Sequence, residues 1–172
     1  MTILLNNKNI NRIKNKKITY VKKFTQNLQN YNFNTLSTLI DDYSLNVVNK
    51  GNFVDFNHTW QVKNVHKANS DFFIFLDFFS KIFYYTSEAR DGVDLFFSFV
   101  TNTGVSHVDT EDVFLIGMHG RTIYRITDTK KDYVLEHGDL LHIPKGIRHK
   151  SISSTPRIIA SVGFYGGKYA TQ

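Results

Sequence analysis

A histidine and an aspartate separated by one residue, His107 and Asp109, have the types and the spacing that could hold a metal ion. On a β-strand, residues i and i+2 point to the same face, so this imidazole and this carboxylate could converge on one ion. Another histidine, His149, could reach that ion from a neighbouring strand. Two histidines and one carboxylate form a facial triad with open coordination positions, as in non-haem Fe(II) oxygenases. The three residues therefore predict a metal site for oxidative chemistry.

The elements that must position these residues read as short strands from about residue 93 onward. Runs of β-branched and aromatic residues alternate with turn signals, which predicts strands at 94–100, 105–109, 112–118, 122–127, 133–135, 139–143, 149–153 and 158–164. Before them, the sequence predicts a helix at 34–43 capped by Asn34, a strand at 52–56 and a helix at 70–85. This order favours a β-rich (α+β) fold, a jelly-roll barrel with N-terminal helices packed outside.

The composition narrows the class of protein. With 172 residues the chain is long enough for one domain with a proper core, and the 15% of aromatic residues against only two prolines favours β-rich packing. Because there are no cysteines, disulfides, thiolate zinc sites and a cysteine nucleophile are excluded. Any metal must be held by His, Asp or Glu.

The net charge of +6 is concentrated near the N-terminus, in the segment 1–23. Its basic residues are Lys8, Arg12, Lys14, Lys16, Lys17, Lys22 and Lys23. We interpret it as a solvated, partly disordered leader ahead of a single domain at 24–172, with the barrel core at 94–164. Deleting residues 1–17 should then leave stability nearly unchanged. The alternative interpretation is a basic arm that binds nucleic acid. It is only weakly supported, because positive and negative charges nearly balance in the rest of the chain.

No segment indicates export or membrane insertion. The first five residues are too short for a signal-peptide core, and the apolar stretch 72–85 is too short to span a bilayer and contains Asp77 and Lys81. A cytoplasmic protein without membrane contact is the default expectation. The stretch 72–85 is apolar beyond a single helical stripe, so it either packs in the core or contributes to a homodimer contact.

Two motifs carry a family resemblance. The pattern Gly138-x5-Pro144-x-Gly146-x2-His149 resembles the second signature of the cupin superfamily, in which a turn aims a metal-binding histidine into the barrel. The segment 104–125, which contains His107-x-Asp109 followed by Asp-Val-Phe-Leu, resembles JmjC-type 2-oxoglutarate oxygenases, and most of all the ribosomal-protein hydroxylases. The resemblance covers about residues 94–164. It implies a double-stranded β-helix of the cupin type.

The resemblance also implies a reaction and its site. His107, Asp109 and His149 would ligate Fe(II), and 2-oxoglutarate would chelate the iron while the enzyme hydroxylates a small molecule or a peptide side chain. In the family a Lys or Arg thirteen residues after the metal-binding Asp grips the cosubstrate, but here Thr122 stands there. Arg157 could supply the missing cation.

The cosubstrate is then expected to contact four residues of this sequence, namely Thr122, Tyr124, Arg157 and Ser161. Arg121 and Arg125 are expected to face outward, because side chains alternate along a strand. A solvated turn position is the alternative for Arg157. Two other functions stay open: a cupin isomerase or dioxygenase that does not use 2-oxoglutarate, and a non-catalytic cupin binding module.

Overall fold

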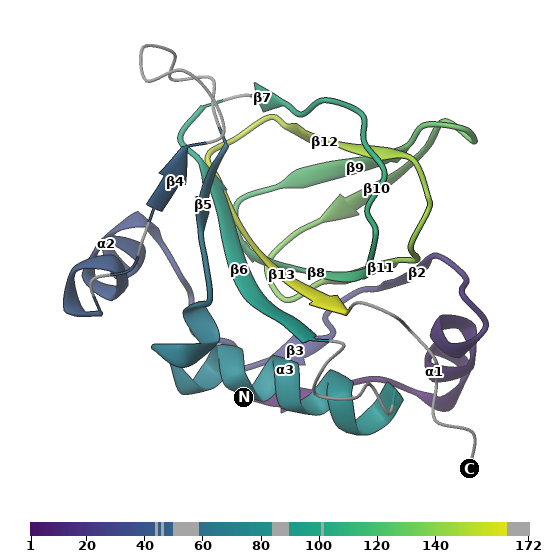
Figure 1. Ribbon diagram of the computed structural model, residues 1–172, viewed down its shortest axis with the longest axis horizontal. Coiled ribbons are helices and arrows are strands. Elements are labelled where there is room, and N and C mark those ends of the chain that lie inside the picture. Colours follow the sequence, from purple (N-terminus) through teal and green to yellow (C-terminus); the bar gives the residue numbers. More distant parts are fainter. Residues whose placement is uncertain (44, 46, 50–58, 84–89, 101, 165–172) are drawn as a thin grey trace.

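Two facing antiparallel sheets form the body of the computed structural model, which describes all residues except 44, 46, 50–58, 84–89, 101 and 165–172 (Figure 1). The strands of the barrel are β6 (Arg90–Ser98), β7 (Asn102–Thr103), β8 (Asp112–His119), β9 (Thr122–Ile126), β10 (Lys131–Leu135), β11 (Leu140–Ile143), β12 (His149–Ser153) and β13 (Arg157–Phe164). The smaller sheet has the order β10-β9-β12-β7. The larger sheet contains β11-β8-β13-β6 and continues at both ends.

Successive strands of the barrel are divided between the two sheets. β6, β8, β11 and β13 belong to the larger sheet, whereas β7, β9, β10 and β12 belong to the smaller one. Neighbours within each sheet are therefore mostly not consecutive in sequence, which is the jelly-roll arrangement of the double-stranded β-helix. The fold class expected from the sequence is confirmed.

Most strands predicted from residue 94 onward agree with the structure to within four residues at each end, but the segment 105–109 differs. Strand β7 lies earlier, at Asn102–Thr103, and His107 takes part only in an isolated antiparallel bridge with His149. The side chains of this segment are largely exposed, and Val105 is among the most exposed apolar residues. The predicted five-residue strand is thus reduced to a single bridge, because little apolar surface is available there to bury.

The N-terminal segment is folded, contrary to the sequence interpretation of a solvated leader. It forms β1 (Thr2–Ile3), α1 (Asn7–Lys14), β2 (Thr19–Val21) and, just beyond, β3 (Thr25–Gln26). Strand β2 extends the larger sheet by pairing with β11. Ile13 is fully buried, and the Lys16 ammonium forms an ion pair with the buried carboxylate of Asp112. Elements of residues 1–23 therefore pack on the barrel.

The remaining N-terminal elements cover the other end of the larger sheet. Helix α2 (Phe33–Asp42) begins after Asn32, whose side chain accepts a hydrogen bond from the backbone N–H of Thr35. The cap predicted at Asn34 is therefore wrong by two residues. Strands β4 (Val47–Asn49) and β5 (Trp60–Val62) add to the sheet beyond β6, and a short 3₁₀ helix at Val65–Lys67 leads to α3. The strand predicted at 52–56 lies outside the described residues.

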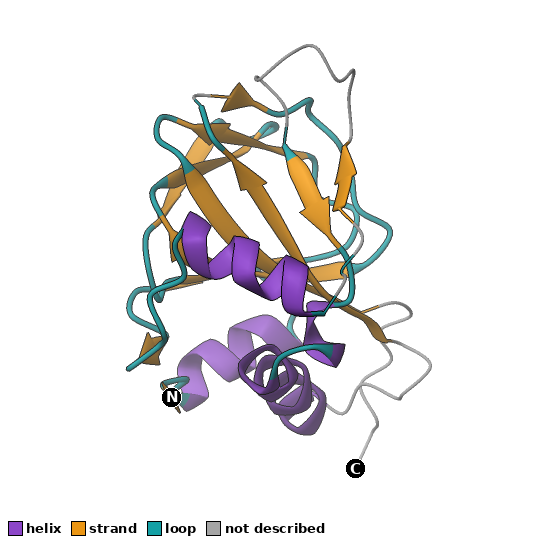
Figure 2. Ribbon diagram, turned by 90° about the vertical axis from the view of Figure 1, so that its left-hand side faces the viewer, coloured by secondary structure: helices purple, strands orange, loops and turns teal. Residues whose placement is uncertain are grey.

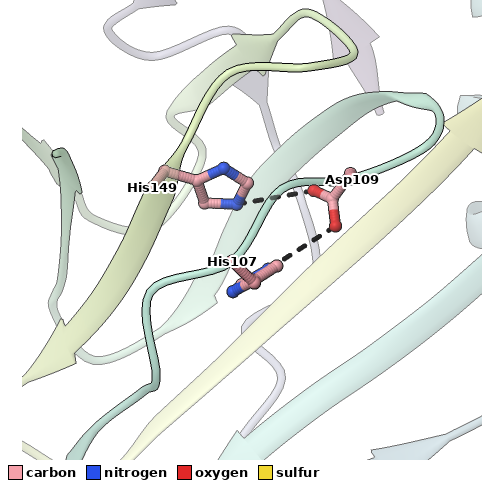
Figure 3. A group of neighbouring side chains, drawn as sticks. All are labelled: His107, Asp109 and His149. Carbon is pink, nitrogen blue, oxygen red and sulfur yellow. Dashed lines mark ion pairs between the residues drawn. The ribbon is translucent and has the colours of Figure 1, made fainter. Parts of the chain in front are cut away.

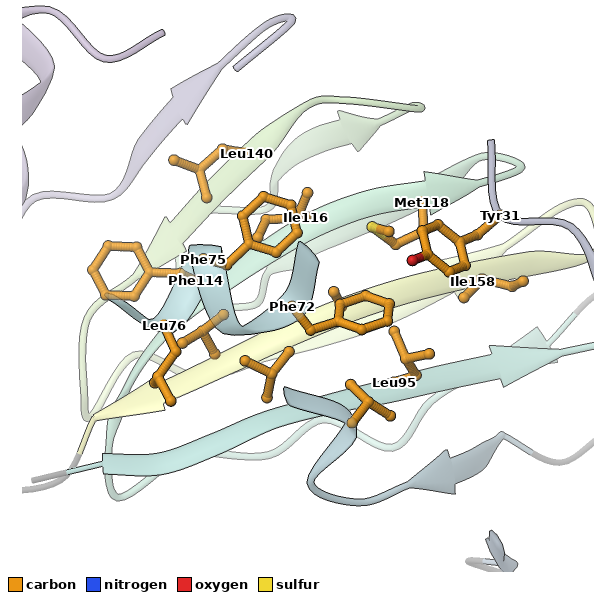
Figure 4. Packing of buried hydrophobic residues seen from close by; sticks show 14 of the residues in the cluster. Tyr31, Phe72, Phe75, Leu76, Leu95, Phe114, Ile116, Met118, Leu140 and Ile158 are labelled. Atoms are coloured by element: carbon orange, nitrogen blue, oxygen red, sulfur yellow. The ribbon is translucent and has the colours of Figure 1, made fainter. Parts of the chain in front are cut away.

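Helix α3 (Ser70–Phe83) packs on the outer face of the larger sheet, as expected for helices outside the barrel (Figure 2). Phe72, Phe75 and Leu76 on the helix pack with strand residues such as Leu95 and Ile116, as Figure 4 shows. Burial of such side chains contributes about 1.5–3 kcal/mol each. The core interpretation of this stretch is confirmed for its buried face. No helix among the described residues is long and apolar enough to cross a membrane.

Candidate metal centre

The backbone brings the two predicted histidine ligands face to face. The N–H of His107 donates to the carbonyl of His149, and the N–H of His149 donates to the carbonyl of His107, each at 2.9 Å. Directly opposite residues in an antiparallel pair hold their side chains close together. The two imidazole centroids are 4.5 Å apart. A bridge of a single residue pair thus positions one ligand from the loop after β7 and one from the start of β12.

The third predicted ligand completes the group. Asp109 Oδ1 lies 3.5 Å from His107 Nε2, and Asp109 Oδ2 lies 3.4 Å from His149 Nε2 (Figure 3). The possible ligand atoms all lie within 4.8 Å of one another. The side chain of His149 is 3% exposed, that of Asp109 25% and that of His107 54%. The structure therefore brings together the three residues predicted from the sequence. His149 lies in the interior, and His107 is open to solvent.

Hydrogen bonds prepare both imidazoles for coordination. Nδ1 of His107 lies 3.0 Å from the carbonyl of Val105, and Nδ1 of His149 lies 2.9 Å from the carbonyl of Ile147. A carbonyl can only accept, so each Nδ1 carries the proton and each Nε2 keeps its lone pair toward Asp109. Burial also lowers the pKa of His149, which favours the neutral imidazole that a metal requires. The donor set fits a divalent iron site.

A turn from a distant part of the chain supports the carboxylate ligand. The N–H of Gly146 donates to the carbonyl of Asp109 at 3.1 Å, and the N–H of Lys145 donates to Asp112 Oδ1 at 2.8 Å. Gly146 has φ +84°, a conformation that other residues rarely adopt. The Pro-x-Gly motif therefore fixes the loop that carries Asp109 as well as the approach to His149.

The three residues open into a large cavity between the two sheets. It measures about 810 Å³, and both sheets and the loop after β7 contribute to its wall. Besides the three possible ligands, the lining residues include Thr59, Gln61, Asp94, Phe96, Tyr124, Ser151, Arg157 and Ser161. A cavity of this size accommodates small organic molecules together with a bound ion.

Arg157 lies in this cavity and is buried, with 2% of its surface exposed. Its guanidinium donates to three hydroxyls, those of Ser98 at 3.3 Å, Thr59 at 3.2 Å and Ser151 at 3.3 Å. Within the described residues no carboxylate forms an ion pair with it. The alternative of a solvated turn residue is excluded. A buried cation surrounded by neutral groups is suited to binding an anion.

The other residues predicted to contact the cosubstrate are placed differently from one another. Tyr124 and Ser161 line the same cavity as Arg157. Burial raises the pKa of Tyr124, although the nearby Arg157 opposes this, so the phenol keeps its proton. Thr122 is fully buried but is not among the lining residues, and its hydroxyl has no hydrogen-bond partner among the residues that the structure describes.

The arginines flanking Thr122 face away from the cavity. Arg121 is exposed, and Arg125 makes two hydrogen bonds of 2.7 Å with the carboxylate of Asp132 on β10. Neither lines the cavity, which agrees with the alternation expected along β9. Among the described residues, Arg157 is therefore the arginine that the fold directs into the interior.

Several polar lining residues were not singled out from the sequence, among them Thr59, Gln61 and Ser151. Thr59 and Gln61 lie at and before β5, and Ser151 lies two residues after His149. For Ser151 a signal existed, because residues i and i+2 on a strand share a face. Gln61 lies in a strand of three residues and Thr59 directly precedes it, within a region that matches no motif, so no pattern in the sequence placed them beside the metal ligands.

The comparisons with known proteins agree with this fold. Residues 127–171 match the family model described as the JmjC domain, a range that includes His149 and Arg157. No curated protein matches the sequence.

Solved structures of YcfD, a ribosomal oxygenase from Escherichia coli, are similar to this chain. One matches with a TM-score of 0.74 and 18% identity over 97% of this chain and 53% of that chain. Another, in complex with cobalt and 2-oxoglutarate, matches with a TM-score of 0.67 and 21% identity over 88% of this chain and 49% of that chain. The chain thus spans about half the length of these YcfD chains. At such identities the likeness establishes the fold.

Proposed function

We propose that this chain is an Fe(II)- and 2-oxoglutarate-dependent oxygenase that hydroxylates a small molecule or the side chain of a peptide or protein. The observation that carries the proposal is one cavity that holds both a two-histidine, one-carboxylate group and a buried arginine with no ion-pair partner among the described residues. The first feature suits a divalent iron, and the second suits an organic dianion.

The metal would be held by His107, Asp109 and His149. Their three donors occupy one side of an ion and leave open positions for a cosubstrate and for O₂. When bound, the iron would activate O₂ with electrons from the oxidative decarboxylation of 2-oxoglutarate, and O₂ would supply the oxygen atom that replaces a C–H bond by C–OH. The protein contributes neutral imidazoles with fixed orientation, a carboxylate tied to the Gly146 turn, and walls that exclude water.

The cosubstrate would place its far carboxylate against Arg157. Guanidinium groups bind carboxylates with charge-assisted hydrogen bonds, and the surrounding hydroxyls can share the remaining oxygen lone pairs. Ser151 accepts a hydrogen bond from Arg157, and Tyr124 and Ser161 line the same cavity. Thr122, at the place where the resemblance implies a basic residue, would contribute only indirectly, from behind the lining residues.

A protein side chain is one candidate for the substrate. The similar structures of YcfD are described as those of a ribosomal oxygenase, which supports a macromolecular substrate for this chain also. The cavity volume of about 810 Å³ leaves space beside the cosubstrate for a side chain or for a small molecule. Assaying hydroxylation of both classes of substrate would decide between them.

Anaerobic titration with Fe(II) and 2-oxoglutarate tests the proposal. Chelation of the iron by a 2-oxo acid produces a charge-transfer band in visible light, and we expect this band to saturate at one equivalent. Asp109→Ala should abolish it, whereas the exposed Asp128→Ala should not. Binding of Fe(II) without the band, or failure to bind Fe(II), would contradict the proposed cosubstrate or the proposed metal site, respectively.

A second candidate function keeps the metal but not 2-oxoglutarate. It is favoured by one observation, the uncharged Thr122 at the position where the resemblance implies a Lys or Arg. In that case the chain would be a cupin isomerase or dioxygenase, and Arg157 would bind an anionic substrate instead. The same titration separates the two, because only the first function predicts the charge-transfer band.

A further inference from the structure

A glutamine on the wall of the cavity carries an acceptor with no donor. Gln61 in β5 is 6% exposed and lines the cavity. Its Nε2 donates to Asp94 Oδ2 at 2.5 Å, while Asp94 Oδ1 accepts from the backbone N–H of Asn64 at 2.8 Å. Gln61 Oε1 is buried and has no hydrogen-bond partner in the part of the chain that the structure describes. A buried acceptor left unpaired costs about 1–3 kcal/mol.

Asp94 determines which way the amide of Gln61 points. A carboxylate can only accept hydrogen bonds, so the NH₂ end must face Asp94 and the oxygen must face the other way. The hydrogen bond to a charged acceptor also polarises the amide and strengthens Oε1 as an acceptor. The hydrogen bond between Gln61 and Asp94 thus determines where the unpaired oxygen lies. The backbone N–H of Asn64 in turn holds Asp94 in place.

The pair and Arg157 share one wall of the cavity, since Thr59, which accepts a hydrogen bond from Arg157 at 3.2 Å, precedes Gln61 by two residues. In the larger sheet, Gln61 is opposite Phe96 and Asp94 is opposite Ser161, whereas Arg157 is opposite Ser98 at the far end of β13. Arg157 therefore offers N–H donors, whereas Gln61 and Asp94 offer an acceptor oxygen and a negative charge. A dianion such as 2-oxoglutarate is attracted to the first and repelled by the second.

We propose that Gln61, oriented by Asp94, recognises the organic substrate by accepting a hydrogen bond from an N–H or O–H group. The substrate then presents a donor at this wall, either an uncharged amide or hydroxyl or a cation, and not a carboxylate or phosphate. The charge of Asp94 favours the cation over the neutral donor. The inference rests on the proposed function for the reaction, but the binding that it describes requires no metal.

The test uses three probes of similar size: butyramide, butylammonium and butyrate. Their dissociation constants for the full chain are measured by ligand-observed NMR, without added metal and again with Zn(II) and 2-oxoglutarate. Gln61→Met, which keeps the size of the side chain but removes its polar atoms, should weaken butyramide and butylammonium at least fivefold. It should leave butyrate unchanged. Gln29→Met, at an exposed glutamine, is the matched control.

A second variant keeps the inference testable if Gln61→Met fails to fold. Asp94→Asn preserves the shape of the pair and removes its charge, so the preference for butylammonium over butyramide should fall at least threefold. The inference is overturned if Gln61→Met binds butyramide as well as the unaltered chain does, or if the three probes do not differ. Failure of the proposed function gives another result: 2-oxoglutarate would not bind, but Gln61→Met would still weaken the binding of butyramide and butylammonium.

Discussion

His107 and His149 are joined by two reciprocal backbone hydrogen bonds of 2.9 Å, so their imidazoles are placed by the main chain. Their Nδ1 atoms are in turn held by the carbonyls of Val105 and Ile147. Neither ring needs to reorganise in order to offer Nε2 to an ion beside Asp109. Because this geometry is preorganised, loss of a ligand side chain should affect metal affinity more than folding.

The first prediction concerns the metal ligands. His107→Ala, Asp109→Ala and His149→Ala should each abolish stoichiometric Fe(II) binding, since two remaining donors are too few to hold the ion. Each variant should stay folded, with the largest loss of stability for the buried His149. Anaerobic calorimetric titration and thermal unfolding measure the two quantities, with Asp128→Ala as the control. Full metal affinity in any one of the three would show that its residue is not a ligand.

The second prediction concerns the buried arginine. Arg157→Ala should raise the dissociation constant of 2-oxoglutarate at least tenfold, which corresponds to about 1.4 kcal/mol, because it removes a buried cation from the wall of the cavity. Arg125→Ala, on the outer face, should have no effect on this constant. Fe(II) affinity, measured in parallel, should be unchanged. If 2-oxoglutarate binds Arg157→Ala as tightly as the unaltered chain, the carboxylate is held elsewhere.

The sequence predicts the barrel and the metal group well because both depend on local patterns. An apolar run bounded by turn residues defines β8, β-branched and aromatic residues define β9, and the motif that ends in His149 marks the start of β12. His107 and Asp109 are close in sequence, so they could be paired without knowledge of the fold. The contact that fixes the N-terminal segment, from Lys16 to Asp112, joins residues far apart in sequence and leaves no such pattern. Gln61 was missed for the same reason, since its role depends on Asp94 in the next strand of the sheet.

The third prediction reverses the expectation that residues 1–17 are dispensable. Ile13 is fully buried against the core, and deleting a buried isoleucine side chain leaves a cavity. Ile13→Ala should therefore lower the free energy of unfolding by about 2–4 kcal/mol, and deletion of residues 1–17 by more than that. Asn11→Ala, at an exposed position of the same helix, is the control. Chemical denaturation measures all three, and an unchanged midpoint for the deletion would restore the interpretation of a solvated leader.

The fourth prediction concerns the ion pair between Lys16 and Asp112. The carboxylate is buried, whereas the lysine side chain is 39% exposed, so solvent screens part of the attraction. Lys16→Met should lower the free energy of unfolding by about 1–2 kcal/mol, because it removes this cation from a buried charge. The exposed Lys22→Met should change it little. Equal stability of the two variants would mean that the pair contributes nothing measurable.

The fifth prediction is a pH dependence that arises from His142. This imidazole is fully buried beside Phe114, and burial lowers its pKa to about 4, with Asp112 and the carbonyl of Lys17 opposing the shift and Lys16 adding to it. In the unfolded chain the ordinary pKa is near 6.5. Between about pH 6.5 and pH 4 only the unfolded chain takes up this proton, so stability is fully present above that window and is lost as the pH falls through it.

The slope is about 1.4 kcal/mol for each pH unit from this one group. His142→Leu places an apolar side chain of similar size next to Phe114, and this side chain cannot be protonated. Its free energy of unfolding should therefore decline less steeply than that of the unaltered chain over the same window. Urea denaturation at several pH values between 7 and 4.5 gives the two slopes. Parallel slopes would show that His142 is not the group that destabilises the fold in acid.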